Sequence, residues 1–186
     1  VLPCLELLGV PKVERKLEYR GWSTGGQQIG SIKFKFTPLA WNQSLDATLW
    51  PKPTEADSVK RIDITMVVPR NVQESLKASL KFELDLVFPG VDIRNVTEED
   101  SRHPTRLYVL LVAHTTNGFR FGRDWLYDKS VKGKSVDDIA TKMAQRVADG
   151  LDTEFRRGGC VDEYLQDQLV VFQALAKGRS VIDSDK

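Results

Sequence analysis

A tyrosine, an aspartate and a glutamine stand close together near the end of the chain, in the stretch CVDEYLQDQLVVFQALAKG, residues 160–178. Tyr164, Asp167 and Gln168 are spaced i, i+3 and i+4, which places them on one face of a helix. The aromatic ring can stack on a base, while the carboxylate and the amide can hydrogen-bond a base edge or a ribose. Such spacing is also typical of the polar margin of any amphipathic helix, so spacing alone leaves both interpretations open.

The helix that must position these residues is predicted from its apolar stripe. Asp162 and Glu163 fall in its first turn, where acidic residues are favourable, and Gly178 ends it. The stripe consists of Val161, Leu165, Leu169, Phe172 and Ala176.

The rest of the chain predicts an α+β fold with mixed or antiparallel sheets and helices packed on one face. We expect three segments: 1–58 as part of a main domain with a β-hairpin, 59–158 as an inserted α/β domain, and 159–186 as a main-domain helix followed by the start of a strand. Residues 1–9 read as the end of a helix. Period-2 alternation predicts strands at 13–20, 31–36, 61–68, 91–96, 106–116 and 119–127, and helical periodicity predicts helices at 71–88 and 135–155.

Composition limits the class of protein. The 186 residues carry a formal net charge of +1, from 27 basic and 26 acidic side chains. The chain therefore lacks the large positive charge of a strong non-specific nucleic-acid binder. No apolar run is long enough for a membrane helix, so no membrane partner is expected. The two cysteines are in no metal-like spacing, and we expect a cytoplasmic or nuclear protein with reduced thiols. The first residue, Val1, opens what looks like a helix already under way, which suggests part of a longer chain.

Two further features of the first hairpin bear on phosphate. Gly25 and Gly26 lie in its connection, GWSTGGQQIG. A glycine-rich connection of this kind is first of all a turn, and its backbone amides form a possible phosphate loop only as a second interpretation. Lys33 and Lys35, with Arg20 nearby, could contact phosphate groups, but outward lysines on a strand more often serve as a solvated edge.

The helix motif resembles a known family, and this resemblance favours the nucleotide-binding interpretation of Tyr164, Asp167 and Gln168. RGGCVDEYLQDQLVVFQALAKG resembles the segment V-D-E-[YH]-L-x-D-Q-L of RNA 3'-terminal phosphate cyclases, whose fold superfamily includes the enolpyruvate transferases. EYRGWSTGGQQIGSIKF looks like the family's R-G-[FY]-x-P-K-G-G-G-x-[VI] hairpin, and residues from about 60 to 158 look like the family's inserted domain, with TTNGFRFG as a turn. The similarity extends over nearly the whole chain.

The resemblance implies an ATP-dependent enzyme that uses a divalent metal. Such cyclases adenylate a histidine, pass AMP to an RNA 3'-phosphate and close a 2',3'-cyclic phosphate by attack of the 2'-hydroxyl. The matching adenylate contacts are Tyr164, Asp167 and Gln168, and an aromatic of the insert hairpin matches either Phe119 or Phe121.

Two departures qualify this expectation. The nucleophilic histidine belongs to an H-x-x-T strand downstream of the helix, and no residue up to Lys186 takes that place; His114, in VAHTT, precedes the helix and suits the end of a buried strand. STGGQ also has Thr24 where the family has lysine. We therefore predict no catalytic residue and no metal ligand in this sequence, and little activity by the chain alone.

The alternative to an enzyme fragment is a non-catalytic cyclase-like binding or scaffold module. Expected partners are an RNA 3' end and a second chain or copy that completes the main domain.

Overall fold

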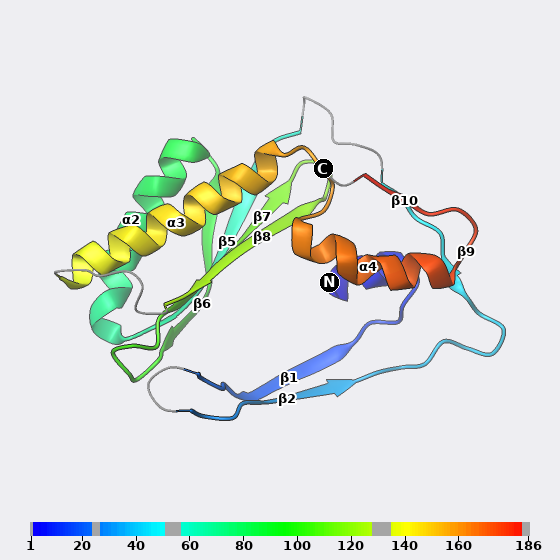
Figure 1. The fold of residues 1–186 in the computed structure, drawn as a ribbon, viewed down its shortest axis with the longest axis horizontal. Coiled ribbons are helices and arrows are strands. Elements are labelled where there is room, and N and C mark those ends of the chain that lie inside the picture. The colour runs from blue at the N-terminus through cyan, green and yellow to red at the C-terminus, as the bar shows by residue number, and fades with distance from the viewer. Residues whose placement is uncertain (1, 24–26, 51–56, 128–134, 184–186) are drawn as a thin grey trace. The chain divides into compact units, whose positions relative to one another are not determined.

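The computed structural model describes residues 2–23, 27–50, 57–127 and 135–183. The chain folds into two compact units (Figure 1). Unit 1 comprises Val1–Trp22, Gln28–Pro53 and Gly158–Lys186, and unit 2 is chiefly Thr54–Arg157. Each unit is described by itself below.

Unit 2 is built on a four-stranded sheet in the order β6-β5-β7-β8. Strand β5 (Val59–Val68) pairs in parallel with β6 (Asp92–Asp100), and the helix α2 (Arg70–Val87) provides the crossover that a parallel pair requires. The other pairings are antiparallel: β5 with β7 (Tyr108–Thr115), and β7 with β8 (Arg120–Leu126). The turn between β7 and β8 is closed by Thr115, whose N–H donates to the carbonyl of Phe119 at 3.0 Å.

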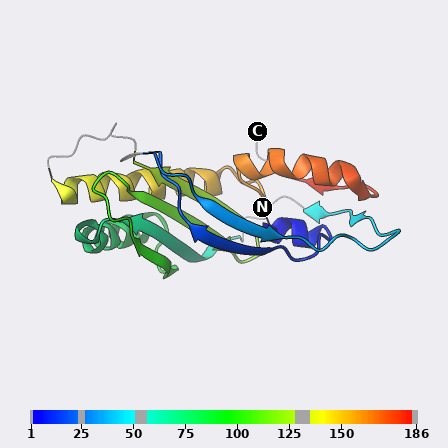
Figure 2. The ribbon, with the colours of Figure 1, turned by 90° about the horizontal axis from the view of Figure 1, so that it is seen from below.

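Both helices of unit 2 cover one face of this sheet. Figures 1 and 2 show α2 beside α3 (Val136–Arg156), and the two helices pack directly on each other. The strands alternate accordingly, since every second residue of β7 from Val109 to Thr115 is buried. The core is a single apolar cluster of strand and helix side chains; its fully buried members include Ile62, Met66, Leu76, Leu80, Leu84, Leu111, Met143 and Leu151.

Unit 1 combines short strands with two helices, α1 (Leu2–Leu7) and α4 (Glu163–Leu175). An antiparallel hairpin joins β1 (Glu14–Tyr19) and β2 (Ser31–Lys35). The remaining strands pair in parallel, β3 (Leu45–Asp46) with β9 (Ala176–Lys177) and β4 (Leu49–Trp50) with β10 (Val181–Ile182). Segments before and after unit 2 in the sequence are thereby brought together. The unit's apolar core comprises Leu5, Leu8, Val13, Leu45, Cys160, Val161, Leu165 and Leu169.

The predicted α+β class, with mixed and antiparallel sheets and helices on one face, is confirmed. One predicted boundary is wrong: the strand was predicted to end at residue 96, but β6 continues through residues 97–100. This acidic segment stays extended because it pairs with β5, and the last pair is Val68 with Asp100. The register of the pairing shifts once, between Ile64 and Thr65. Residues 41–50, where no helix or strand was predicted, also contain β3 and β4, because each finds a parallel partner from beyond α4. Within the described ranges, no helix is both long and apolar enough to cross a membrane.

Candidate functional site

The helix α4 begins with a side-chain cap. The carboxylate of Asp162, the N-cap residue, accepts a hydrogen bond from the N–H of Leu165 at 2.8 Å. Leu165 and Leu169 are buried, which fixes the rotation of the helix about its axis. The cap and these two anchors therefore determine which side chains α4 presents to solvent.

Tyr164, Asp167 and Gln168 all lie on the exposed part of α4. Tyr164 is 59% exposed, although it retains an interaction within the chain. Val171 and Leu175 are 61% and 65% exposed and continue the row that starts at Tyr164 and Gln168 at helical spacing. The row of Tyr164, Gln168, Val171 and Leu175, with Asp167 beside it, combines a flat ring and aliphatic surface with polar groups. Its chemistry suits an adenine base with hydrogen bonds to a base edge or ribose.

The two candidate phenylalanines belong to unit 2, not to the unit that carries α4. Phe121 is 2% exposed and packs edge-on against Phe155, with ring centroids 6.0 Å apart. Phe119 is only partly buried against the same core. Of the two, Phe119 keeps the larger surface for contact with a ligand.

Gly25 and Gly26 lie outside the described residues, as does Thr24. The structure does describe the neck of the hairpin, as we name Gly21, Trp22, Gln28 and Gly30. A Cβ on Gly21 would lie 2.6 Å from the backbone nitrogen of Gly30, so the two strands touch there without side chains. Trp22 and Gln28 close the neck with reciprocal hydrogen bonds of 2.8 and 2.9 Å. Gly21 and Gly30 thus have a packing role that is independent of any ligand.

The lysines of β2 are ion-paired across the hairpin. Lys33 lies 2.6 Å from Glu18, and Lys35 lies 2.9 Å from Glu14. Their charges are therefore largely balanced locally, which favours the solvated face over phosphate binding.

Cys160 is a structural thiol. It is buried, and its Sγ–H donates to the carbonyl oxygen of Asp183 at 2.9 Å. Burial raises the pKa of Cys160 to about 11, so the thiolate that a nucleophile needs is not formed at neutral pH. No group of three or more His, Cys, Asp or Glu side chains suited to a metal ion occurs in the described part of the chain.

His114 lies at the end of β7 in unit 2, within a polar cluster that the sequence did not predict. Its Nε2 is 2.8 Å from Oδ2 of Asp63 and 3.1 Å from Nη2 of Arg61. Burial lowers the pKa of His114 and outweighs the opposing effect of Asp63, so the imidazole is neutral at pH 7. The alternation of β5 already placed Arg61 and Asp63 on one face, but the sequence did not reveal which residue of β7 stands opposite them.

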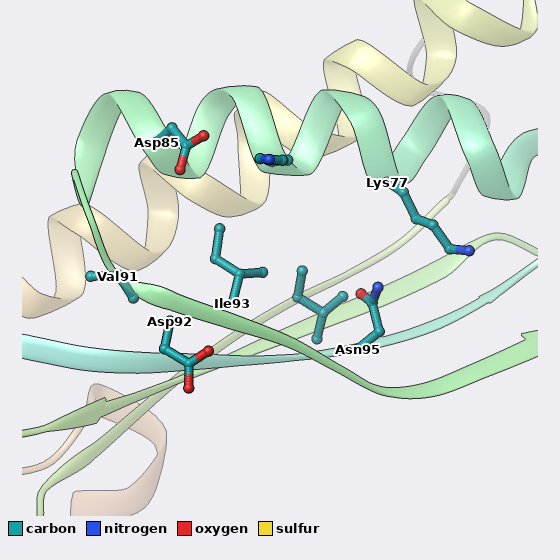
Figure 3. A pocket seen from close by; sticks show the side chains of 8 residues that line it. Lys77, Asp85, Val91, Asp92, Ile93 and Asn95 are labelled. Atoms are coloured by element: carbon teal, nitrogen blue, oxygen red, sulfur yellow. The ribbon is translucent and has the colours of Figure 1, made fainter.

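A groove of about 420 Å³ lies between α2 and the edge strand β6 (Figure 3). Lys77 contributes to it, but its ammonium group is 2.7 Å from Glu98 and 3.0 Å from Glu74, contacts that raise the pKa of Lys77. Asp85 and Asp92 add negative charge to the lining. The mixed charge gives this groove no clear preference for an anion.

The whole chain, residues 1–186, matches the family model of the RNA 3'-terminal phosphate cyclases. The chain belongs to this family. The resemblance of the α4 motif is thereby supported by a match that also includes the hairpin and unit 2.

Individual cyclase relatives align with shorter parts of the chain. A probable RNA 3'-terminal phosphate cyclase of Dictyostelium discoideum is 39% identical over 119 residues, which is 64% of this chain and 25% of that protein. RNA 3'-terminal phosphate cyclases of Drosophila melanogaster and Caldivirga maquilingensis are 32% and 35% identical over 78 and 72 residues, which are 20% and 18% of their lengths. These alignments thus span a quarter or less of each relative.

Proposed function

We propose that this cyclase-family chain supplies the adenosine-binding face for ATP-dependent conversion of an RNA 3'-phosphate to a 2',3'-cyclic phosphate. The observation that carries the proposal is the exposed position of Tyr164, Asp167 and Gln168 on a capped helix, within the motif that matches the family. Tyr164 would stack on the adenine, and Asp167 and Gln168 would bind the base edge or the ribose. We name the row of Tyr164, Gln168, Val171 and Leu175, with Asp167 beside it, the adenosine face.

In this proposal the chain binds and orients adenosine but does not by itself form a covalent intermediate. ATP, with a divalent metal, supplies the adenylyl group. No position in these 186 residues matches the nucleophilic histidine of the family motif, and Cys160 is held as a thiol. The nucleophile, the metal ligands and most triphosphate contacts would come from other sequence of the same protein or from a second chain.

The proposal is tested first by nucleotide binding. Tyr164→Ala should weaken the binding of ATP to the chain by roughly tenfold, because stacking of a base on an aromatic ring contributes about 1–3 kcal/mol. Calorimetry or the fluorescence of an ATP analogue labelled on the ribose measures this. Tyr19→Ala is the matched control, since Tyr19 is 55% exposed but lies on β1. Equal affinity of wild type and Tyr164→Ala would overturn the adenosine face.

A second candidate function is a non-catalytic binding or scaffold module of the same family. It is favoured by Thr24 at the position where the family hairpin carries lysine, because the change removes a charge that could pair with phosphate. Incubation of the full-length protein with ATP labelled in the α-phosphate and a divalent metal separates the two candidates. Covalent AMP supports the enzyme, and ATP binding without an adduct supports the module.

A further inference from the structure

The sheet of unit 2 has a second face that neither α2 nor α3 covers. We name it the helix-free face. At one end, a single cross-strand row runs over all four strands, because Asp92 pairs with Arg61, Arg61 with His114, and His114 with Arg120. The next row adds Arg94 opposite Asp63. Residues from β5, β6, β7 and β8 thus gather several charged groups in a small area.

Asp63 holds two of these groups in place. Its Oδ1 lies 2.9 Å from Nε of Arg61, and its Oδ2 lies 3.1 Å from Nη2 of Arg61 and 2.8 Å from Nε2 of His114. Although close, Nε of Arg61 and Oδ1 of Asp63 are not aligned for a hydrogen bond, and both atoms are buried without such a partner. Arg61 is therefore held beside the imidazole of His114, while its side chain remains 32% exposed.

Arg120 extends the row and is not neutralised. It is exposed, and it forms no ion pair within the part of the chain that the structure describes. Arg94 is bound to Asp92 at 2.7 Å. Three arginines therefore face two aspartates in the two rows, which leaves an excess positive charge at Arg120.

The ion pairs of the two rows compensate Arg61 and Arg94 but leave the charge of Arg120 unbalanced. An anion bound beside Arg120 would compensate that charge. Arginine suits phosphate in particular, because its planar guanidinium offers several donors in a fixed geometry.

We propose that the row Arg61–His114–Arg120 on the helix-free face binds a backbone phosphate of single-stranded RNA. The choice of RNA rests on the proposed cyclase function; the anion site itself rests on the row. Arg120 makes the main charge contact, Arg61 adds a donor, and Asp63 is a positioning residue. Contact with an internal phosphodiester would hold the body of the RNA strand, without reading its sequence or its 3' end.

Fluorescence anisotropy of the 186-residue chain with a labelled single-stranded RNA, in the absence of ATP, tests the site. Arg120→Glu should weaken binding by roughly fivefold or more and lower the salt dependence by about 0.7 in the logarithmic slope. Lys81→Glu is the matched control: Lys81 is exposed on α2, which covers the opposite face, and it changes charge by the same amount. It should change affinity less than twofold.

Three results would overturn the proposal. The first is equal weakening by Arg120→Glu and Lys81→Glu, or by neither, with thermal melts showing that both variants fold. The second is a preference for an RNA with a 3'-phosphate over the same RNA with a 3'-hydroxyl that Arg120→Glu abolishes, since contact with an internal phosphodiester should not distinguish the two RNAs. The third is displacement of RNA by inorganic phosphate or ATP at matched phosphate concentration, which would assign the row to a free anion.

The experiment also separates this site from the adenosine face. Tyr164→Ala should leave RNA binding unchanged, and Arg120→Glu should leave ATP binding unchanged. Failure of the adenosine face would therefore appear in the ATP titrations alone. Failure of the phosphate row would appear in the RNA titrations alone.

Discussion

Glu154 shows how one residue can depend on its ion-pair partners. It is 3% exposed in α3, where its carboxylate accepts from Nη2 of Arg123 at 2.8 Å and lies 3.3 Å from Nη1 of Arg157. A buried carboxylate is tolerated only while such partners compensate its lost hydration. The polar side chain thus belongs to the architecture of unit 2 rather than to a ligand site.

We predict that Glu154→Ala destabilises the protein by about 3 kcal/mol, because it removes the buried carboxylate that the partly buried Arg123 and Arg157 both contact. Chemical denaturation monitored by circular dichroism measures the change in the free energy of unfolding. Asp149→Ala, at an exposed position of the same helix, should change that free energy by less than about 0.5 kcal/mol. Similar effects of the two substitutions would show that the ion pairs of Glu154 contribute little.

Cys160 provides a prediction about pH. Burial raises its pKa from 9.0 to about 11, so the folded state holds the thiol proton more tightly than the unfolded chain. This contribution to stability is fully present below pH 9 and is lost as the pH rises toward 11. In a Cys4→Ser background, iodoacetamide at pH 8 should modify Cys160 rapidly only after unfolding. Rapid modification of the native protein, measured by mass spectrometry, would contradict the buried thiol.

At the scale of elements, the hairpin of unit 1 depends on the close approach of two glycines. Gly21 and Gly30 meet at the neck, directly beside the paired Trp22 and Gln28. A two-stranded hairpin is marginally stable alone, so its few cross-strand hydrogen bonds matter. Any substitution that separates the strands here should therefore weaken these hydrogen bonds.

We predict that Gly30→Ala opens this neck, because the new methyl group would overlap the backbone of Gly21. The amide hydrogens of Trp22 and Gln28 should then exchange with solvent at least about tenfold faster, as their hydrogen bonds weaken. Hydrogen exchange followed by NMR gives both rates. Lys33→Ala, on the solvated face of β2, is the control and should leave them nearly unchanged.

At the scale of the whole molecule, the chain divides into units of different character. Unit 2 has a continuous core between its sheet and its two helices. Unit 1 instead leaves large apolar side chains exposed, and on its hairpin these include Leu17, Tyr19, Ile32, Phe34 and Phe36. Exposed apolar surface of this kind marks a region suited to further contacts.

We predict that residues 54–157 fold without unit 1, because the core of unit 2 is built from its own elements. The isolated segment should unfold cooperatively in denaturant, and Leu111→Ala within it should cost about 3 kcal/mol, since Leu111 is fully buried. Gradual unfolding, or binding of a dye that recognises exposed apolar surface, would contradict an independent domain.

The sequence by itself determined the elements wherever periodicity and end signals agreed. Helical periodicity predicted helices at 71–88 and 135–155, and the structure forms them as α2 and α3. The position of Tyr164, Asp167 and Gln168 on one part of α4 also followed from spacing. These features are local, so neighbouring residues suffice to specify them.

Only the tertiary structure decided which strands became partners and in which register. It extended β6 through an acidic segment and gave β3 and β4 partners from the far end of the chain. It also aligned Arg61, His114 and Arg120, which stand 53 and 6 residues apart in sequence order. Cross-strand neighbours depend on the packing of whole sheets against their helices, and local sequence patterns do not contain that information.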